Sequence, residues 1–88
     1  MASKSEIIQS ILNNFRPAPY LKKIKVGLRP GDDDKIILVV EYTIEKEKLQ
    51  GKPVNKEQLL AWTHDLASKI RSASKLPIGF TRSEVQYI

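Results

Sequence analysis

The segment from Ile36 to Ile44 constrains the fold of this 88-residue chain more than any other part. It opens with the longest apolar run, Ile36-Ile37-Leu38-Val39-Val40, and then alternates aromatic or apolar residues with polar ones. Five apolar residues fall far short of the roughly 20 that a membrane helix needs. Alternation with many β-branched residues predicts a strand instead, and a strand that is apolar on both faces belongs in the centre of a sheet. We therefore expect a sheet built around residues 35–45.

A second strand is predicted over residues 20–28, where Ile24, Val26 and Leu28 share one face. The turn-forming segment Pro30-Gly31-Asp32-Asp33-Asp34 joins it to the central strand and predicts a hairpin. With the turn centred near Asp32, Val26 lies beside Leu38, Ile24 beside Val40, and Lys23 opposite Glu41. Such pairing aligns the apolar faces and forms a cross-strand ion pair.

Two helices and a third strand complete the predicted elements. Ser3 and Glu6 have capping-box spacing before an apolar stripe that ends near Phe15, and Asn55 caps a helix that should end near Ser74. Residues 45–54 between them are charged and broken by glycine and proline, so we expect a loop there. Residues 79–88 read as a strand whose apolar parity shifts, which indicates a bulge or an edge strand.

These elements predict a single two-layer α+β domain over residues 1–88, in the order α-β-β-α-β, with two helices on one face of a three-stranded sheet. Central placement of the 35–45 strand gives the sheet order 1-2-3, with the third strand parallel to the second after a right-handed crossover. An alternative order places the first strand in the centre of a fully antiparallel, ferredoxin-like sheet. The patterns favour the first order and leave the second open.

The α-β-β-α-β order resembles the small type II KH-like domains of ribosome-associated proteins. In that family a GxxG loop before the second helix clamps a nucleic-acid backbone. The matching segment here, Gly51-Lys52-Pro53-Val54, keeps the first glycine and a lysine and lacks the second glycine. The resemblance implies contact with RNA, through an order of elements rather than through a matched motif.

Basic residues supply one candidate site. The chain has 15 Lys and Arg against 10 Asp and Glu, a net charge of +5 that is concentrated in the first thirty residues. Phosphate groups bind clustered cations and the amides of a helix N-terminus. The first functional hypothesis is therefore a small non-enzymatic protein that contacts RNA or another nucleic acid. The candidate residues are Lys22, Lys23, Lys25, Arg29, Lys52 and Lys56.

The sheet face opposite the helices supplies a second candidate. Leu21, Ile37 and Val39 are predicted to lie there among charged residues. Exposed apolar residues with a charged rim mark association surfaces. The alternative hypothesis is therefore a protein–protein interaction module that forms a homodimer by pairing two sheets back to back.

Enzyme chemistry finds little support in the sequence. The chain has no cysteine, one histidine, and no Walker, GxGxxG or GxSxG motif. A hydrolase that uses His64 is kept as a remote alternative, and the Asp32-Asp33-Asp34 run is interpreted as a solvated turn. We expect no enzyme activity, cofactor, metal or membrane contact, and a cytoplasmic location, because the N-terminal segment lacks the apolar stretch of a secretory signal.

Overall fold

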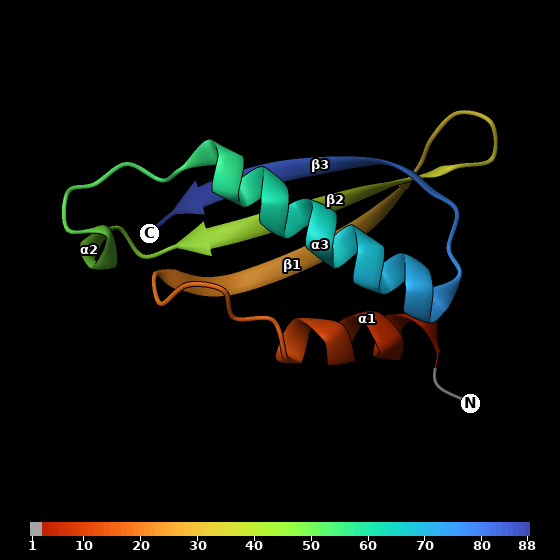
Figure 1. Ribbon diagram of the computed structural model, residues 1–88, viewed down its shortest axis with the longest axis horizontal. Coiled ribbons are helices and arrows are strands. Elements are labelled where there is room, and N and C mark those ends of the chain that lie inside the picture. The colour runs from red at the N-terminus through yellow and green to blue at the C-terminus, as the bar shows by residue number, and fades with distance from the viewer. Residues whose placement is uncertain (1–2) are drawn as a thin grey trace.

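A computed structural model describes residues 3–88 of the chain (Figure 1). Its elements are α1 (Lys4–Asn13), β1 (Leu21–Pro30), β2 (Ile36–Ile44), α2 (Lys46–Leu49), α3 (Lys56–Ser74) and β3 (Ile78–Tyr87). The predicted α-β-β-α-β order and the α+β class are confirmed. The one-turn helix α2 lies in the segment that the sequence predicted to be a loop, and it ends where Gln50 adopts the left-handed backbone conformation.

The sheet has the order β1-β2-β3, with β1 antiparallel and β3 parallel to β2. The predicted order 1-2-3 is confirmed, and the alternative with the first strand in the centre is wrong. β2 is central because it carries buried apolar residues on both of its faces. Most of it is buried, including Leu38, Val39 and Val40. A parallel neighbour needs a long crossover connection, and α3 provides it.

The register of the β1–β2 hairpin differs from the predicted one by two residues. Val26 pairs with Val40 rather than Leu38, and Lys25 rather than Lys23 pairs with Glu41. The reason is a later turn: the Gly31 N–H donates to the Lys35 carbonyl at 2.8 Å, so the loop is centred on Asp33. Asp33 and Asp34 both have positive φ, which aspartate tolerates better than most residues. A shift of two residues keeps the hairpin side chains from Lys23 onward on their predicted faces.

Side-chain caps fix the starts of the two long helices. Ser3 Oγ accepts a hydrogen bond from the Glu6 N–H at 3.2 Å. Asn55 Oδ1 accepts from the Glu57 and Gln58 N–H groups at 2.9 and 3.3 Å. These bonds satisfy amides that the first helical turn leaves free. Both N-terminal boundaries and the end of α3 at Ser74 agree with the sequence prediction.

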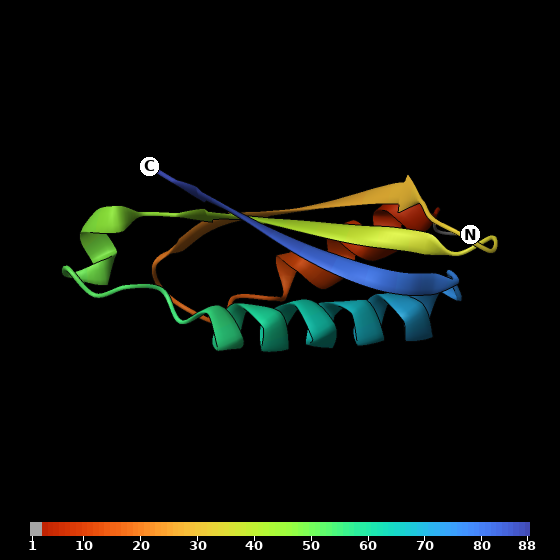
Figure 2. The same cartoon turned by 90° about the horizontal axis from the view of Figure 1, so that it is seen from above.

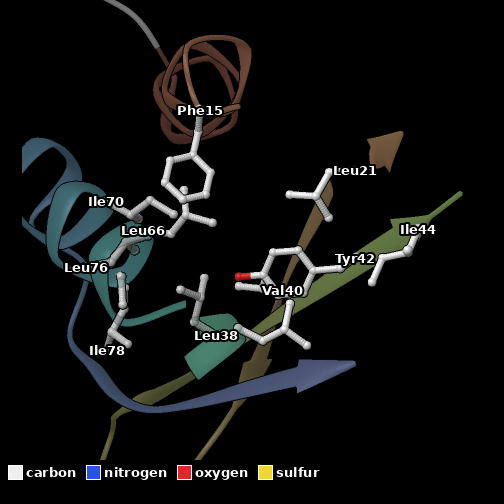
Figure 3. Packing of buried hydrophobic residues seen from close by; sticks show 12 residues of the cluster. Phe15, Leu21, Leu38, Val40, Tyr42, Ile44, Leu66, Ile70, Leu76 and Ile78 are labelled. Carbon is white, nitrogen blue, oxygen red and sulfur yellow. The ribbon is translucent and has the colours of Figure 1, made fainter. Parts of the chain in front are cut away.

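The core lies between the sheet and the helices. Figure 2 shows α3 along one side of the sheet, while α1 slants from the level of α3 toward the free edge of β1 and no helix covers the opposite side. Figure 3 shows Phe15, Leu66 and Ile70 directed toward the side chains of β2. Leu38, Val40, Tyr42 and Ile44 are fully buried there. The even-numbered face of β2 therefore contributes most of the core.

Three hydroxyl groups join β2, α3 and β3 inside this core. Thr63 Oγ1 lies 2.8 Å from Tyr42 Oη and 2.7 Å from Ser83 Oγ, and it donates to the Leu59 carbonyl at 2.9 Å. Thr63 and Tyr42 are fully buried, and burial raises the pKa of the Tyr42 phenol. Buried polar groups must be paired. This cluster, the Tyr42–Thr63–Ser83 node, therefore fixes how α3 sits on two strands of the sheet.

Candidate interaction face of the sheet

The sheet side that no helix covers is formed by alternate residues of all three strands (Figure 2). We call it the open face. Its residues are Lys23, Lys25, Gly27 and Arg29 on β1, Ile37, Val39, Glu41 and Thr43 on β2, and Phe80, Arg82, Glu84 and Gln86 on β3. Residues paired across strands point to the same face. Each open-face residue of β2, together with its partners on β1 and β3, therefore forms a row of three side chains.

Apolar side chains gather at the hairpin end of the open face. Ile37 lies between Arg29 on β1 and Phe80 on β3. The Phe80 side chain is 70% exposed, the most exposed of the large hydrophobic residues. Val39, in the next row, is only 4% exposed, although no helix lies above it. Its cover therefore comes from neighbouring side chains of the sheet itself, which leaves Phe80 and Ile37 as the accessible apolar surface.

The middle of the open face carries an unbalanced row of charges. Lys25, Glu41 and Glu84 are neighbours across β1, β2 and β3. Like charges placed side by side on adjacent strands destabilise a sheet. Arg82 forms an exposed ion pair with Glu84 at 3.5 Å, and such exposed pairs stabilise only weakly. The row therefore retains two carboxylates for one lysine.

The structure corrects one of the three predicted interface residues. Ile37 and Val39 lie on the open face as predicted, whereas Leu21 does not. Leu21 is 6% exposed and belongs to the core beneath the sheet, where Figure 3 shows it near Tyr42. The register shifts between Leu21 and Lys23, which breaks the alternation and turns Leu21 to the helix side.

Sequence reasoning missed the contribution of β3 to this face. The strand shifts register at Gly79, between the Ile36–Ile78 and Ile37–Phe80 pairs. A Cβ on Gly79 would lie 2.8 Å from the Lys35 side chain, so glycine permits this close approach. The bulge sends Ile78 into the core and Phe80 to the open face. The parity shift in residues 79–88 was the available signal, but it did not show which side each residue would take.

The six predicted nucleic-acid-binding residues do not form one surface. Lys23, Lys25 and Arg29 lie together on the open face along β1. Lys56 is the first residue of α3, which lies on the other side of the sheet, and Lys52 belongs to the loop between α2 and α3. Lys22 lines a groove between α1 and β1 together with Lys23 and Lys25. Four of the six residues therefore lie along β1, and Lys52 and Lys56 lie apart from them. In the Gly51–Val54 loop, Val54 stands where the nucleic-acid clamp has its second glycine, and Pro53 lacks a backbone N–H.

Residues 3–88 hold no group of three or more His, Asp or Glu side chains placed to bind a metal ion. The predicted solvated turn at Asp32-Asp33-Asp34 is an exposed loop between β1 and β2. His64 is an exposed residue of α3. Within the same range, no helix combines the length and the apolar character required to cross a membrane.

Comparison with known proteins shows the fold and nothing finer. No protein-family model matches the chain, and no curated protein matches it by sequence. A solved structure of a MamM variant is similar over 99% of this chain and 100% of its own length, with 12% identity and a TM-score of 0.51. A variant of the MamM CTD covers 98% of this chain and 100% of its own, with 12% identity and a TM-score of 0.49. The first likeness shows a shared small α+β fold over nearly the whole length of both chains.

Proposed function

We propose that this chain is a non-enzymatic interaction module that forms a symmetric homodimer through its open face. The observation that supports the proposal is an uncovered sheet side with accessible Phe80 and Ile37 at one end and the Lys25–Glu41–Glu84 row at its middle. Apolar residues with a charged rim are typical of protein interfaces.

The charge pattern favours one arrangement of the two sheets. A two-fold axis along β2 places β1 of one copy over β3 of the other and β2 over β2. Residues of one row then meet the same row, so Lys25 lies over Glu84 of the partner subunit. Each row thus sets its lysine against a carboxylate of the other copy. The two Ile37 side chains meet on the axis, and so do the two Glu41 side chains, so the two stacked rows together still hold four carboxylates for two lysines. An axis across the strands would instead place β1 over β1, with lysines facing lysines.

The same arrangement gives Phe80 a partner. It lies in the row of Arg29, so the guanidinium of one copy is placed over the aromatic ring of the other. Cations above aromatic rings are attracted by the ring's negative face. Twisted sheets pack with their strands roughly 30° apart, so these contacts hold best near the axis. The proposed interface therefore has Ile37 and Val39 along its axis with Lys25–Glu84 and Arg29–Phe80 contacts at its sides, and the Glu41 carboxylates on the axis oppose association.

The size of the face sets the expected affinity. Nine residues of β2 at ~3.3 Å each and three strands ~4.8 Å apart give a flat area of roughly 400 Å² per copy. Stable interfaces bury about 800 Å² per partner. We therefore expect a dissociation constant in the micromolar range, where association is detected by varying the protein concentration.

Sedimentation velocity from about 10 µM to about 1 mM tests the proposal over the affinity range expected for so small an interface. The sedimentation coefficient should rise with concentration for the natural chain. Phe80→Glu should abolish the rise, and because Phe80 is exposed this substitution leaves the core intact. Leu60→Glu is the matched control: Leu60 is 53% exposed on α3, away from the open face, and its variant should still dimerise. A natural chain that stays monomeric throughout the range contradicts the proposal.

A charge exchange tests the direction of the two-fold axis. Lys25→Glu places carboxylates of two copies opposite each other and should weaken the dimer. The double variant Lys25→Glu, Glu84→Lys restores opposite charges and should recover association. Recovery would not follow if β1 lay over β1, because two glutamates would still face each other there. The RNA hypothesis and the cytoplasmic location stay predictions, and binding of oligonucleotides at the open face in place of dimerisation would favour the former.

A further inference from the structure

A second surface lies at the free edge of β1, on the other side of the sheet from the open face. α1 packs mainly against α3 and makes few contacts with β1. Figure 1 shows α1 and β1 diverging toward the hairpin end. The space between them is a groove of about 630 Å³, which we call the β1 groove. Its α1 wall includes Ile8 and Leu12, and its β1 wall includes Ile24, Val26 and Leu28.

The backbone of β1 faces this groove without a strand partner. The Gly31 N–H bonds to Lys35, which lies opposite it across the hairpin. In an antiparallel ladder the residues that bond to the neighbouring strand alternate with residues whose N–H and C=O point away from it. The odd-numbered residues of β1 therefore bond to β2, and Ile24, Val26 and Leu28 direct their amides and carbonyls outward. An unpaired edge of this kind accepts a further strand.

The rim of the groove is basic throughout. Its lining includes the cations Lys4, Arg16, Lys22, Lys23 and Lys25 and contains no aspartate or glutamate. The three ion pairs among residues 3–88 involve none of these five residues. The floor, in contrast, is aliphatic, and Leu28 is 42% exposed. The groove thus combines a hydrogen-bonding edge, an apolar floor and an uncompensated positive rim.

We propose that the β1 groove binds an extended acidic segment of a partner protein, which adds to β1 as a fourth strand. Strand addition takes affinity from main-chain hydrogen bonds and specificity from alternate side chains. In the added strand, one set of side chains enters the groove beside Ile24, Val26 and Leu28 and is apolar. The other set faces the same side as Lys23 and Lys25 and is acidic, which gives cross-strand ion pairs.

The shape of the groove favours a peptide over a nucleic acid. Single-stranded nucleic acids bind by stacking their bases on accessible aromatic rings as well as by phosphate contacts. The one aromatic side chain in the lining is Phe15, which is 8% exposed and lies under the Lys69 ammonium, 5.3 Å from its ring centre. No accessible aromatic surface remains in the groove for a base.

An NMR titration of the ¹⁵N-labelled full chain tests this proposal. The probe is a capped decapeptide of alternating glutamate and valine; a lysine–valine decapeptide and decauridylate serve as comparisons. The acidic peptide should shift the amides of Ile24, Val26 and Leu28 and slow their hydrogen exchange. Absence of binding at about 1 mM peptide, equal binding of the lysine peptide, or tighter binding of decauridylate in the groove overturns the proposal.

Peptide chemistry tests strand addition without altering the protein. N-methylation of every valine removes the N–H groups that an antiparallel added strand would donate to β1, and N-methylation of every glutamate removes those of a parallel one. One of the two methylated peptides should lose binding at least tenfold while the other retains it. Equal affinity of both for the chain contradicts pairing along the edge.

Charge variants test the basic rim. Lys4→Glu with Lys22→Glu reverses one charge on each wall and should weaken the acidic peptide at least tenfold. Lys52→Glu with Lys56→Glu changes the net charge equally, outside the groove, and should change the affinity less than threefold. Circular dichroism verifies that each variant is folded, and Lys4→Ala with Lys22→Ala replaces the first pair if it is not. Equal losses in both pairs would show an effect of net charge alone and overturn the proposal.

Discussion

Replacement of Thr63 by valine removes the centre of the Tyr42–Thr63–Ser83 node with almost no change in shape. Thr63 Oγ1 contacts Tyr42 Oη at 2.8 Å and Ser83 Oγ at 2.7 Å, and Tyr42 is fully buried. In Thr63→Val the Tyr42 hydroxyl loses its only hydrogen-bond partner among residues 3–88, and Tyr42 is fully buried from water. A buried hydroxyl without a partner costs about 1–3 kcal/mol. The Ser83 hydroxyl is half-buried and adds less to this loss of stability, because water can replace its lost partner.

The magnitude is large for a domain of this size. At roughly 0.05–0.15 kcal/mol per residue, 88 residues give a free energy of unfolding of about 4–13 kcal/mol. A loss of about 2 kcal/mol lowers the melting temperature by ~8–16 °C, since each kcal/mol corresponds to ~4–8 °C in a domain of 60–100 residues. Thermal unfolding followed by circular dichroism at low protein concentration measures this shift without a contribution from dimerisation.

A double-mutant cycle separates the hydrogen bonds from the packing. Tyr42→Phe removes the hydroxyl that Thr63→Val leaves unpaired, so the double variant should be less destabilised than the sum of the singles, by about 0.5–3 kcal/mol. Thr81→Val is the control, because Thr81 is half-buried on β3 and its side chain forms no hydrogen bond with any residue from 3 to 88. It should change the unfolding free energy by less than about 0.5 kcal/mol. A stable Thr63→Val variant, or full additivity in the cycle, would refute the role assigned to the node.

Two further predictions concern stability. Because burial raises the pKa of Tyr42 in the folded chain, the unfolded chain releases this proton first as the pH rises. The contribution of Tyr42 to stability should therefore be constant below the ordinary tyrosine pKa of about 10 and fall above it. Guanidinium unfolding above that pH should show a smaller fall in Tyr42→Phe than in the natural chain. Tyr20, whose pKa burial also raises, accounts for part of the remaining fall. Asn55→Ala removes the cap of α3 and should lower the unfolding free energy by ~1 kcal/mol, whereas Asn13→Ala, at an exposed position in α1, should change it little.

The fold was predictable where one physical rule decided the outcome alone. An apolar run on both faces of residues 36–40 placed β2 in the centre, and the short polar side chain of Asn55 before a stripe of apolar residues marked the start of α3. These signals are local, and tertiary contacts reinforce them rather than oppose them. Fold class, sheet order and helix boundaries followed from them.

The site was predictable only in part, because single-residue irregularities decide which face a strand residue takes. The bulge after Leu21 and the bulge at Gly79 each insert one residue into a strand. Each insertion moves the residue before it to the opposite face of the sheet. Leu21 was therefore placed on the wrong face, and Phe80 was not recognised as part of the open face. The hairpin register depended on two aspartates with positive φ, a conformation that composition does not reveal. Alternation alone carries no information on such insertions.

Lys25 belongs to both proposed surfaces, and this links them. In the dimer its ammonium lies over Glu84 of the partner subunit, and in the peptide complex it lies beside a glutamate of the added strand. An ammonium group shared between two carboxylates forms a weaker ion pair with each of them. Binding at the two surfaces should therefore be mutually unfavourable, and by linkage each weakens the other by the same factor.

The expected factor is measurable. An exposed ion pair stabilises by ~0.2–1 kcal/mol and the symmetric dimer contains two Lys25–Glu84 pairs, so the dimer constant should weaken by about 2- to 30-fold when the glutamate–valine peptide saturates both grooves. Sedimentation of the natural chain with and without peptide measures this change. In Lys25→Ala the shared cation is gone, so the peptide should leave the remaining association unaltered. If the peptide still weakens the dimer of Lys25→Ala, the coupling arises from the geometry of the sheet and not from this lysine. If the peptide does not weaken the dimer of the natural chain, binding at the two surfaces is independent and the coupling is refuted.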